Sequence, residues 1–386
     1  MRLSDLFSEE RVARVAKFAA LGFAIAFAAL LTRSHNLIYA SGGAIGADFV
    51  TFWAASDLAL SGEAARAYDS AAIIAAERKA LPQAQDVYLW HYPPPFQLVV
   101  LPLALVPYLW AYGLWLAVSL AIYAITFRAA FREPAPFWLA IGASAVYVNA
   151  LHGQNGLLTA ALAAGGLLLL ERKPLLAGLL IGALCYKPHL GLPLGLLLLI
   201  GAHWRAAAGA VLAVIALCVV SALILGTDTW RAFLANAATA RAVLEGGAVP
   251  WHKMASVFAT VRLAGGDLTL AYIAHGVVAL VVLAATAIAW RGRGPFELKV
   301  ALAALAALLI SPYLFDYDLA VSALALGLLL RDGFTRGWLP GMRPAIVVLW
   351  LAPAVLSYVA EATHVQLQAV ALLVTWALAW QRLRSA

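Results

Sequence analysis

Long, uninterrupted runs of apolar residues constrain this chain more than any other feature of its sequence. Of its 386 residues, 64% are hydrophobic and 12% are charged, whereas soluble domains are about half apolar and a quarter charged. A transmembrane helix uses about 20 apolar residues, so the apolar content suffices for roughly a dozen such helices. The runs are rich in Leu and Ala and do not alternate with polar residues, which argues against a β-barrel. The composition excludes a soluble enzyme, a disordered chain and a disulfide scaffold, and predicts an all-α polytopic membrane protein.

The apolar runs predict twelve transmembrane helices in a single integral membrane domain over residues 1–386. The first run has no evident signal-peptide cleavage site, so we expect it to be a retained helix. Lys187 and Pro188 separate two short apolar runs. If these two runs formed one kinked helix instead of two spans, every later helix would have the opposite orientation. The expected spans are residues 18–31, 109–131, 135–151, 155–171, 174–186, 189–202, 206–226, 269–290, 296–313, 316–331, 344–359 and 365–382.

The distribution of charge predicts which side of the membrane each loop faces. Lys and Arg concentrate in cytoplasmic loops. With both termini in the cytoplasm, the inner side holds 17 of the 26 basic residues and 7 of the 19 acidic residues. Arg172 and Arg205 then share the inner side, which favours a hairpin at Lys187 over a kinked helix. The net charge of +7 therefore indicates orientation, and we expect no nucleic-acid partner.

Two long polar segments face the outer side in this topology, over residues 32–95 and 227–268. In the first, Phe49, Trp53 and Leu58 recur at helical spacing, which predicts a short amphipathic helix on the membrane surface above the active site. Three consecutive prolines after Tyr92 then force a rigid entry into a helix that is too short to span the membrane.

Nearly all the remaining polar residues also fall on the outer face, where several loops converge. Polar and ionisable groups near lipid are costly and usually serve a function, so we expect a site at the outer interface. The candidate residues are Asp48, His91, Tyr92, Gln154, Asn155, Lys187, His189, His252, Lys253, Arg262, Asp316 and Tyr317.

Each candidate also has a purely structural interpretation. Asp48 is well placed to cap the helix that follows it. Gln154 and Asn155 suit hydrogen bonds between helices, and Lys187 could extend to the interface.

The same holds for the later candidates. Interfacial anchoring accounts for His252, Lys253 and Arg262 as well as an anionic site does. Asp316 and Asp318 would point in different directions on a helix, and only an extended segment would put both on one face, where they could bind a metal.

The order of several short motifs resembles that of a known enzyme family over residues 40–330. The motifs are Asp48-Phe49, Trp53-Ala54-Ala55, Tyr68-Asp69, Tyr92-Pro93-Pro94-Pro95-Phe96, Leu101-Pro102-Leu103, Gly153-Gln154-Asn155, Lys187-Pro188, Ser256-Val257-Phe258 and Ser311-Pro312. In these motifs the chain is similar to glycosyltransferase family 87, membrane enzymes that include polyprenol-phosphate-mannose-dependent mannosyltransferases acting on phosphatidylinositol mannosides. One departure is Phe315-Asp316-Tyr317-Asp318, where many relatives carry His-Tyr after the Ser-Pro.

The resemblance implies a GT-C-type fold with about twelve transmembrane helices and juxtamembrane helices on the outer face. It implies a polyprenyl-phosphate hexose as donor, mannose being the best-known sugar, and a lipid-linked or glycan acceptor. Asp48 would be the general base of an inverting transfer, with no cofactor and no required metal. The location implied is a bacterial inner membrane with the active site on the periplasmic side.

The residues suit this chemistry. A carboxylate can activate an acceptor hydroxyl, and preorganised cations can stabilise a leaving phosphate; the candidate cations are Lys187, His189, Lys253 and Arg262. Two other classes remain open. A secondary transporter or flippase of a lipid or small solute would place Lys187 on a broken helix at mid-membrane, and a scaffold subunit would use the outer loops for docking.

Overall fold

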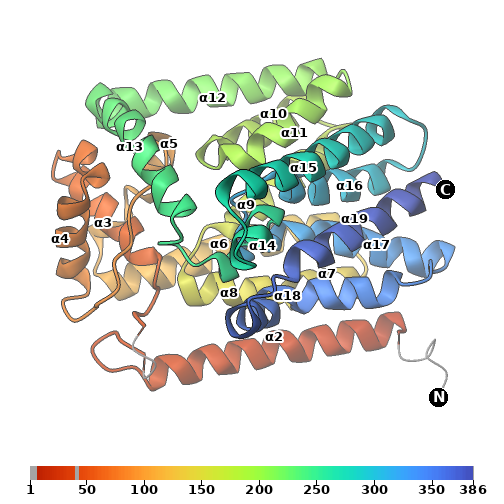
Figure 1. Cartoon of the computed structure of the whole chain (residues 1–386), viewed down its shortest axis with the longest axis horizontal. Coiled ribbons are helices and arrows are strands. Elements are labelled where there is room, and N and C mark those ends of the chain that lie inside the picture. The colour runs from red at the N-terminus through yellow and green to blue at the C-terminus, as the bar shows by residue number, and fades with distance from the viewer. Residues whose placement is uncertain (1–6, 40–42, 386) are drawn as a thin grey trace.

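The computed structural model describes residues 7–39 and 43–385, which fold into a helical bundle (Figure 1). Within these residues there is no β-strand, only isolated bridges. Arg2 and Asp5, which entered the charge balance, lie outside the described residues. The prediction of an all-α polytopic membrane protein is confirmed.

Helices occupy every expected span, but only some are long enough to cross a bilayer. Among the described residues, six spans reach that length: α2 (Glu9–Thr32), α6 (Tyr108–Ala130), α7 (Pro134–Ile141) with α8 (Ser144–His152), α12 (Trp204–Leu225), α15 (Leu268–Arg291) and α18 (Met342–Thr363). The others are α9 (Gly156–Leu169), α10 (Pro174–Gly182) with η3 (Ala183–Tyr186), α11 (Pro188–Ile200), α16 (Phe296–Ile310), η5 (Asp316–Val321) with α17 (Ser322–Arg336), and α19 (Gln368–Arg384).

Several of the twelve expected spans are therefore shorter than a bilayer is thick, and burial explains why. Helix α16 has 15 residues, about 22 Å at 1.5 Å per residue, which is short of a hydrocarbon core of about 30 Å. Residues 300–309 of α16 are nearly all buried, so the helix lies inside the bundle, where lipid does not set its length. By contrast, α12 exposes Leu212, Val219 and Leu223, as a helix facing lipid would.

Helices α10 and α11 form a hairpin. Glu171, just before α10, and Gly201, just after α11, line the same cavity. Both ends of the pair therefore lie together, and the chain reverses at Lys187. This excludes the single kinked helix.

The start of α2 and the end of α19 lie at the same end of the bundle, on the right of Figure 1. Ion pairs tie the elements together there. The Arg331 guanidinium lies 2.9 Å from Glu297 and 3.8 Å from Glu133, and Arg382 lies 2.5 Å from Asp332. These basic residues link the ends of neighbouring helices as well as adding positive charge at this end.

The remaining helices belong to the two long polar segments. They are α3 (Phe49–Leu60), η1 (Ala64–Tyr68), α4 (Ser70–Ala80), α5 (Pro94–Val100), η2 (Leu103–Leu105), α13 (Thr227–Glu245), η4 (Trp251–Lys253) and α14 (Val257–Leu263). Of these, α3, α4 and α13 lie on the left of Figure 1, away from the termini. As expected, α5 is too short to span a membrane.

The prediction that α3 lies on the membrane surface is wrong, because most of the helix is buried. Its apolar positions pack against α4, α5, η1 and η2. Its buried Ser56 is satisfied inside the protein: the Ser56 hydroxyl donates to the Leu101 carbonyl at 2.6 Å and accepts from the Ala104 N–H at 2.9 Å. Helix α3 is therefore an interior helix that fixes the position of Asp48 at its start.

Candidate functional site

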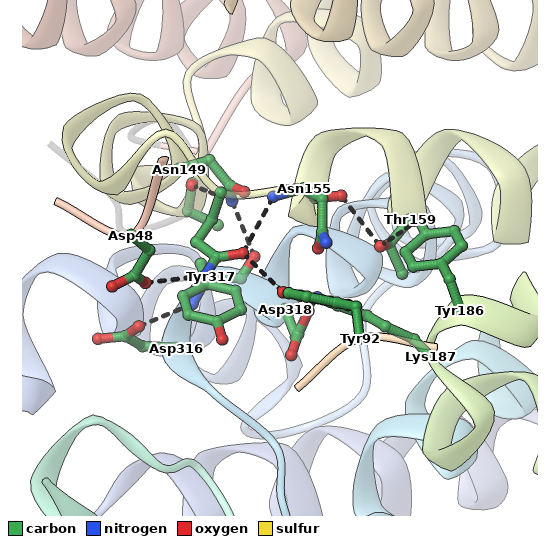
Figure 2. Close-up of polar contacts among 12 residues, drawn as sticks. Asp48, Tyr92, Asn149, Asn155, Thr159, Tyr186, Lys187, Asp316, Tyr317 and Asp318 are labelled. Carbon is green, nitrogen blue, oxygen red and sulfur yellow. Dashed lines mark hydrogen bonds and ion pairs between the residues drawn. The ribbon is translucent and has the colours of Figure 1, made fainter. Parts of the chain in front are cut away.

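Three chain reversals meet at one place, and Asp48 joins them from the first polar segment (Figure 2). The first is the turn between α8 and α9 at residues 153–155, the second is the hairpin tip at Lys187, and the third is the segment from residue 311 to residue 321 between α16 and α17. Helix α9 packs against η5, and α3 lies against the first turn through Phe49 and Gly153. Polar residues distant in the sequence are thereby brought together.

Asp48 is the residue before α3, but its side chain forms no hydrogen bond to that helix. Its Oδ2 instead accepts a hydrogen bond from Gln154 Nε2 at 2.8 Å. The Gln154 Oε1 in turn accepts from the Tyr92 hydroxyl at 3.1 Å. The capping interpretation of Asp48 is therefore not supported, and three predicted site residues form one hydrogen-bonded chain.

Glycine at position 153 makes this contact possible. Gly153 ends α8 in the left-handed conformation, with φ of 60°, which side chains disfavour. A Cβ at this position would lie 2.4 Å from the Phe49 Cβ. Only glycine therefore lets the turn approach the start of α3 closely enough for Gln154 to reach Asp48.

Lys187 forms a buried ion pair with Asp318. The distance from Nζ to Oδ1 is 2.5 Å, and the two side chains are 3% and 1% exposed. The ammonium also lies 4.9 Å from the centre of the Tyr317 ring. Lys187 thus points into the protein, so the interpretation that it extends to the interface is wrong.

Asp316 points away from Asp318, as the helical alternative for this segment predicted. Both belong to the short 3₁₀ helix η5. Asp316 Oδ2 accepts a hydrogen bond from the Ser357 hydroxyl at 2.7 Å, and its Oδ1 accepts from the Tyr317 N–H at 2.8 Å. The two carboxylates bind different partners: Asp316 binds Ser357, and Asp318 binds Lys187. No cluster of three or more metal-ligating side chains occurs in the described part of the chain.

The two candidate cations of the second polar segment, Arg262 and Lys253, differ in their contacts. Arg262 donates to the carbonyls of Gly266 at 2.9 Å and Glu245 at 3.2 Å, and its guanidinium stacks 4.4 Å from the Trp251 ring centre. It therefore fastens this segment together. Lys253 is half-buried and its side chain forms no hydrogen bond or ion pair with any described residue, yet its charge acts on Asp316.

The side chains of the three predicted histidines do not take part in the hydrogen bonds that join Asp48, Gln154 and Tyr92. His91 Nδ1 and His189 Nε2 are buried with no hydrogen-bond partner among the described residues, and burial lowers the pKa of His91. His189 lies near the charges of Lys187 and Asp318. Burial also lowers the pKa of His252, whose carbonyl accepts a hydrogen bond from Gln366 at 2.9 Å.

Sequence reasoning missed residues that complete the site. Asn149 Nδ2 donates at 2.8 Å to the Tyr317 carbonyl and so holds η5 against α8. His152 lies within range of the charges of Asp48 and Lys253. Asp318 was noted as a neighbour of Asp316 but not as the partner of Lys187. A polar residue inside an apolar run was the available signal for Asn149.

The Thr159 hydroxyl links the first turn to the hairpin. It donates a hydrogen bond to the Asn155 carbonyl at 3.0 Å. The Thr159 hydroxyl also lies 2.8 Å from that of Tyr186, directly before Lys187. The Gln154 side chain joins separate segments by hydrogen bonds, as the interpretation of Gln154 and Asn155 as links between helices expected, whereas the Asn155 side-chain amide is buried and has no hydrogen-bond partner among the described residues.

Comparison with known protein families matches residues 90–312 to the model of glycosyltransferase family 87. The match covers more than half of the chain. The chain belongs to glycosyltransferase family 87. No curated protein and no solved structure gives a significant match.

Family 87 membership identifies the chain as a glycosyltransferase, and its helices make it a membrane protein. The matched range contains Tyr92, Gln154, Lys187 and Lys253, whereas Asp48 and Asp318 lie outside it. The structure therefore joins two carboxylates from outside the matched range to polar residues inside it.

Proposed function

We propose that this family 87 glycosyltransferase moves a hexose, with mannose as the first sugar to test, from a polyprenyl-phosphate donor to a hydroxyl of a lipid-linked or glycan acceptor. Asp48 is the general base. The observation that supports this role is the asymmetry of its carboxylate. Gln154 binds Oδ2 at 2.8 Å, while no described residue donates a hydrogen bond to Oδ1, and the side chain is half-buried.

In the proposed reaction, Asp48 Oδ1 accepts the proton of the acceptor hydroxyl. The acceptor oxygen bonds to the anomeric carbon, and the bond from that carbon to the phosphate oxygen breaks. The electron pair of that bond leaves with the polyprenyl phosphate. A positioned base of this kind contributes about 10²–10⁴-fold to the rate. A single displacement with one base inverts the anomeric centre, unlike the two-carboxylate chemistry of retaining glycosidases.

Lys253 is the proposed cation for the leaving phosphate. Charge that develops on a leaving group is best stabilised by groups already in place. Lys187 is neutralised by Asp318 at 2.5 Å, and Arg262 is engaged with backbone carbonyls. Lys253 keeps its charge available and shares the neighbourhood of Asp48 through His152.

The same reasoning gives roles to the other polar groups. Gln154 orients Asp48, and Tyr92 fixes the Gln154 amide through the bond from its hydroxyl to Oε1. Tyr317, whose ring stacks on Phe315 with centroids 5.3 Å apart, and Asp316 are candidates for contact with the sugar. The proposed topology has the termini in the cytoplasm of a bacterial inner membrane and the site on the periplasmic side, as the charge balance indicates.

The test is sugar transfer by purified protein in detergent or nanodiscs, with radiolabelled polyprenyl-phosphate hexoses and a total-lipid acceptor extract. Asp48→Asn should lower transfer at least about 10²-fold, the lower bound for loss of a general base. The matched control is Asp57→Asn on the same helix, because Asp57 pairs only with the exposed Lys79. Near-normal turnover by a correctly folded Asp48→Asn protein would exclude Asp48 as the base.

The same assay separates the enzyme from the transporter. A transferase yields a new labelled glycolipid in detergent, where no membrane separates two compartments. Uptake of label into proteoliposomes without any new product would favour the transporter instead. Family membership favours the transferase.

A further inference from the structure

A second polar site lies where α11, α15 and α16 end or begin, apart from Asp48 and its partners. A cavity of about 360 Å³ opens there, lined by Glu171, Gly201, His203, Trp290, Arg291 and Lys299 among others. Its volume falls within the range of about 300–1,000 Å³ that is typical of small-molecule sites. Glu171 follows α9 and Gly201 follows α11, so the cavity collects the ends of four helices.

One wall of the cavity carries a buried donor with no acceptor. Trp290 is 5% exposed, and no described residue accepts a hydrogen bond from its Nε1. Buried polar groups are nearly always hydrogen-bonded, so an exception calls for a bound partner. The indole N–H can only donate, and the partner must therefore carry an acceptor.

Gly201 keeps the space beside this donor open. A Cβ at position 201 would lie 2.5 Å from Trp290 Nε1. The His203 ring packs edge-on to the indole, with centroids 6.1 Å apart. A side chain at position 201 would thus block the approach to the donor.

Two cations complete the cavity. Lys299 Nζ donates to the carbonyls of Trp290 at 3.3 Å and Gly292 at 2.5 Å, which leaves one of its three protons. Arg291 is exposed, and its side chain forms no ion pair or hydrogen bond with a described residue. Glu171 supplies the opposing negative charge, so the lining has one net positive charge when His203 is neutral.

We propose that this cavity binds a phosphate-bearing anion, in the first instance the headgroup of an anionic phospholipid in the leaflet next to the chain termini. Trp290 Nε1 donates to one phosphate oxygen, Arg291 offers its forked donors to others, and Lys299 adds a point charge. The apolar side chains of Ile200 and Phe296, also in the lining, suit the glycerol and first acyl carbons. This site is independent of the proposed sugar transfer.

The test measures binding of dioleoyl phosphatidylglycerol and, separately, of inorganic phosphate to the purified, delipidated full chain by native mass spectrometry and thermal shift. Trp290→Phe removes the N–H and keeps the ring, and Arg291→Gln removes the charge. Each should weaken binding by about tenfold or more, as expected for loss of a hydrogen bond to a charged group. Arg293→Gln is the matched control, because Arg293 is exposed and does not line the cavity.

The binding results distinguish a lipid headgroup, a soluble anion and a general surface charge. Lipid binding that is sensitive to Trp290→Phe and Arg291→Gln but not to Arg293→Gln supports the headgroup. The same pattern with inorganic phosphate and none with lipid supports the anion site and makes its ligand soluble. Equal effects of the two Arg variants with Trp290→Phe unchanged would show a general surface charge and overturn the proposal, as would the binding of neither probe.

Discussion

Lys187 and Asp318 form an ion pair across the interior of the bundle, with 2.5 Å between Nζ and Oδ1. The pair joins the tip of the α10–α11 hairpin to η5, which are 131 residues apart in the sequence. Lys187 Nζ also lies over the Tyr317 ring. Two of the three chain reversals that form the site are therefore held together by a charge interaction.

Removing one partner of this pair should destabilise the protein. Lys187→Ala leaves the Asp318 carboxylate buried without a cation, which costs about 3–5 kcal/mol in comparable pairs. Thermal unfolding in detergent should show this loss, while Lys79→Ala, which breaks the exposed pair with Asp57, should cost less than about 1 kcal/mol.

The double variant Lys187→Met with Asp318→Leu should recover most of the lost stability, because it leaves no charge buried. The sequence instead suggested the hypothesis that Lys187 is a cation for the leaving phosphate. A Lys187→Ala protein of normal stability with weakened donor binding would favour that hypothesis over the structural role.

Gln154 should act on the rate through Asp48. Gln154→Leu removes the hydrogen bond that fixes the carboxylate, so kcat should fall by roughly tenfold to a hundredfold while KM for the donor changes little. Gln154→Glu should be worse, because it places a second negative charge beside Asp48. The pH–rate profile should also change in Gln154→Leu, which a merely structural residue would not cause.

Gln83→Leu is the control for this prediction, since Gln83 is exposed and, among the described residues, its side chain hydrogen-bonds to Asn36 alone. Steady-state kinetics at several pH values measures both effects. Equal kinetics for Gln154→Leu and Gln83→Leu would remove Gln154 from the catalytic arrangement.

The sequence allowed the composition of the site to be predicted better than its contacts. Apolar runs located the helices, and the scarcity of polar residues in them pointed to Asp48, Gln154 and Lys187. The partner of Lys187 was not predictable, because either Asp316 or Asp318 could have faced it and only the 3₁₀ geometry of η5 selects Asp318.

The error over α3 has a similar origin. Phe49, Trp53 and Leu58 suggested one apolar face, but Ser56 and Thr51 are small enough to be buried as well. Ser56 forms its two hydrogen bonds with Leu101 and Ala104, and the spacing of apolar residues along the sequence does not reveal such tertiary partners.

Lys253 should contribute to donor binding. Lys253→Ala removes the one cation near Asp316 that lacks a partner among the described residues, so KM for the lipid phosphosugar should rise by about tenfold, equivalent to roughly 1.4 kcal/mol. Lys253→Arg should restore part of the affinity, because the charge is kept.

Arg231→Ala is the matched control, since the Arg231 side chain is 79% exposed and pairs with Asp228. Donor titrations at two ionic strengths give the measurement, and the Lys253 effect should shrink as salt rises. An unchanged KM in Lys253→Ala would assign the phosphate to another group.

Glu77 should make the first polar segment less stable as pH rises. Its side chain is buried in α4, the Tyr88 N–H donates to Oε2 at 3.3 Å, and no described residue donates to Oε1. Burial raises the pKa of Glu77 from 4.5 to about 8. Between these two values the folded state holds a proton that the unfolded state has released, so the free energy of unfolding falls as pH increases, by up to about 1.4 kcal/mol per pH unit.

Glu77→Gln keeps a neutral, hydrogen-bonding side chain and should remove this slope. The variant should therefore gain stability over the parent protein more at pH 8 than at pH 5.5, as measured by thermal unfolding and by the rate of proteolysis within residues 43–92. Glu63→Gln is the control, because Glu63 is exposed and pairs with Arg66, and its slope should match that of the parent. A parent protein whose stability is constant from pH 5.5 to pH 8 would show that Glu77 is charged throughout, and that a cation or water reaches Oε1.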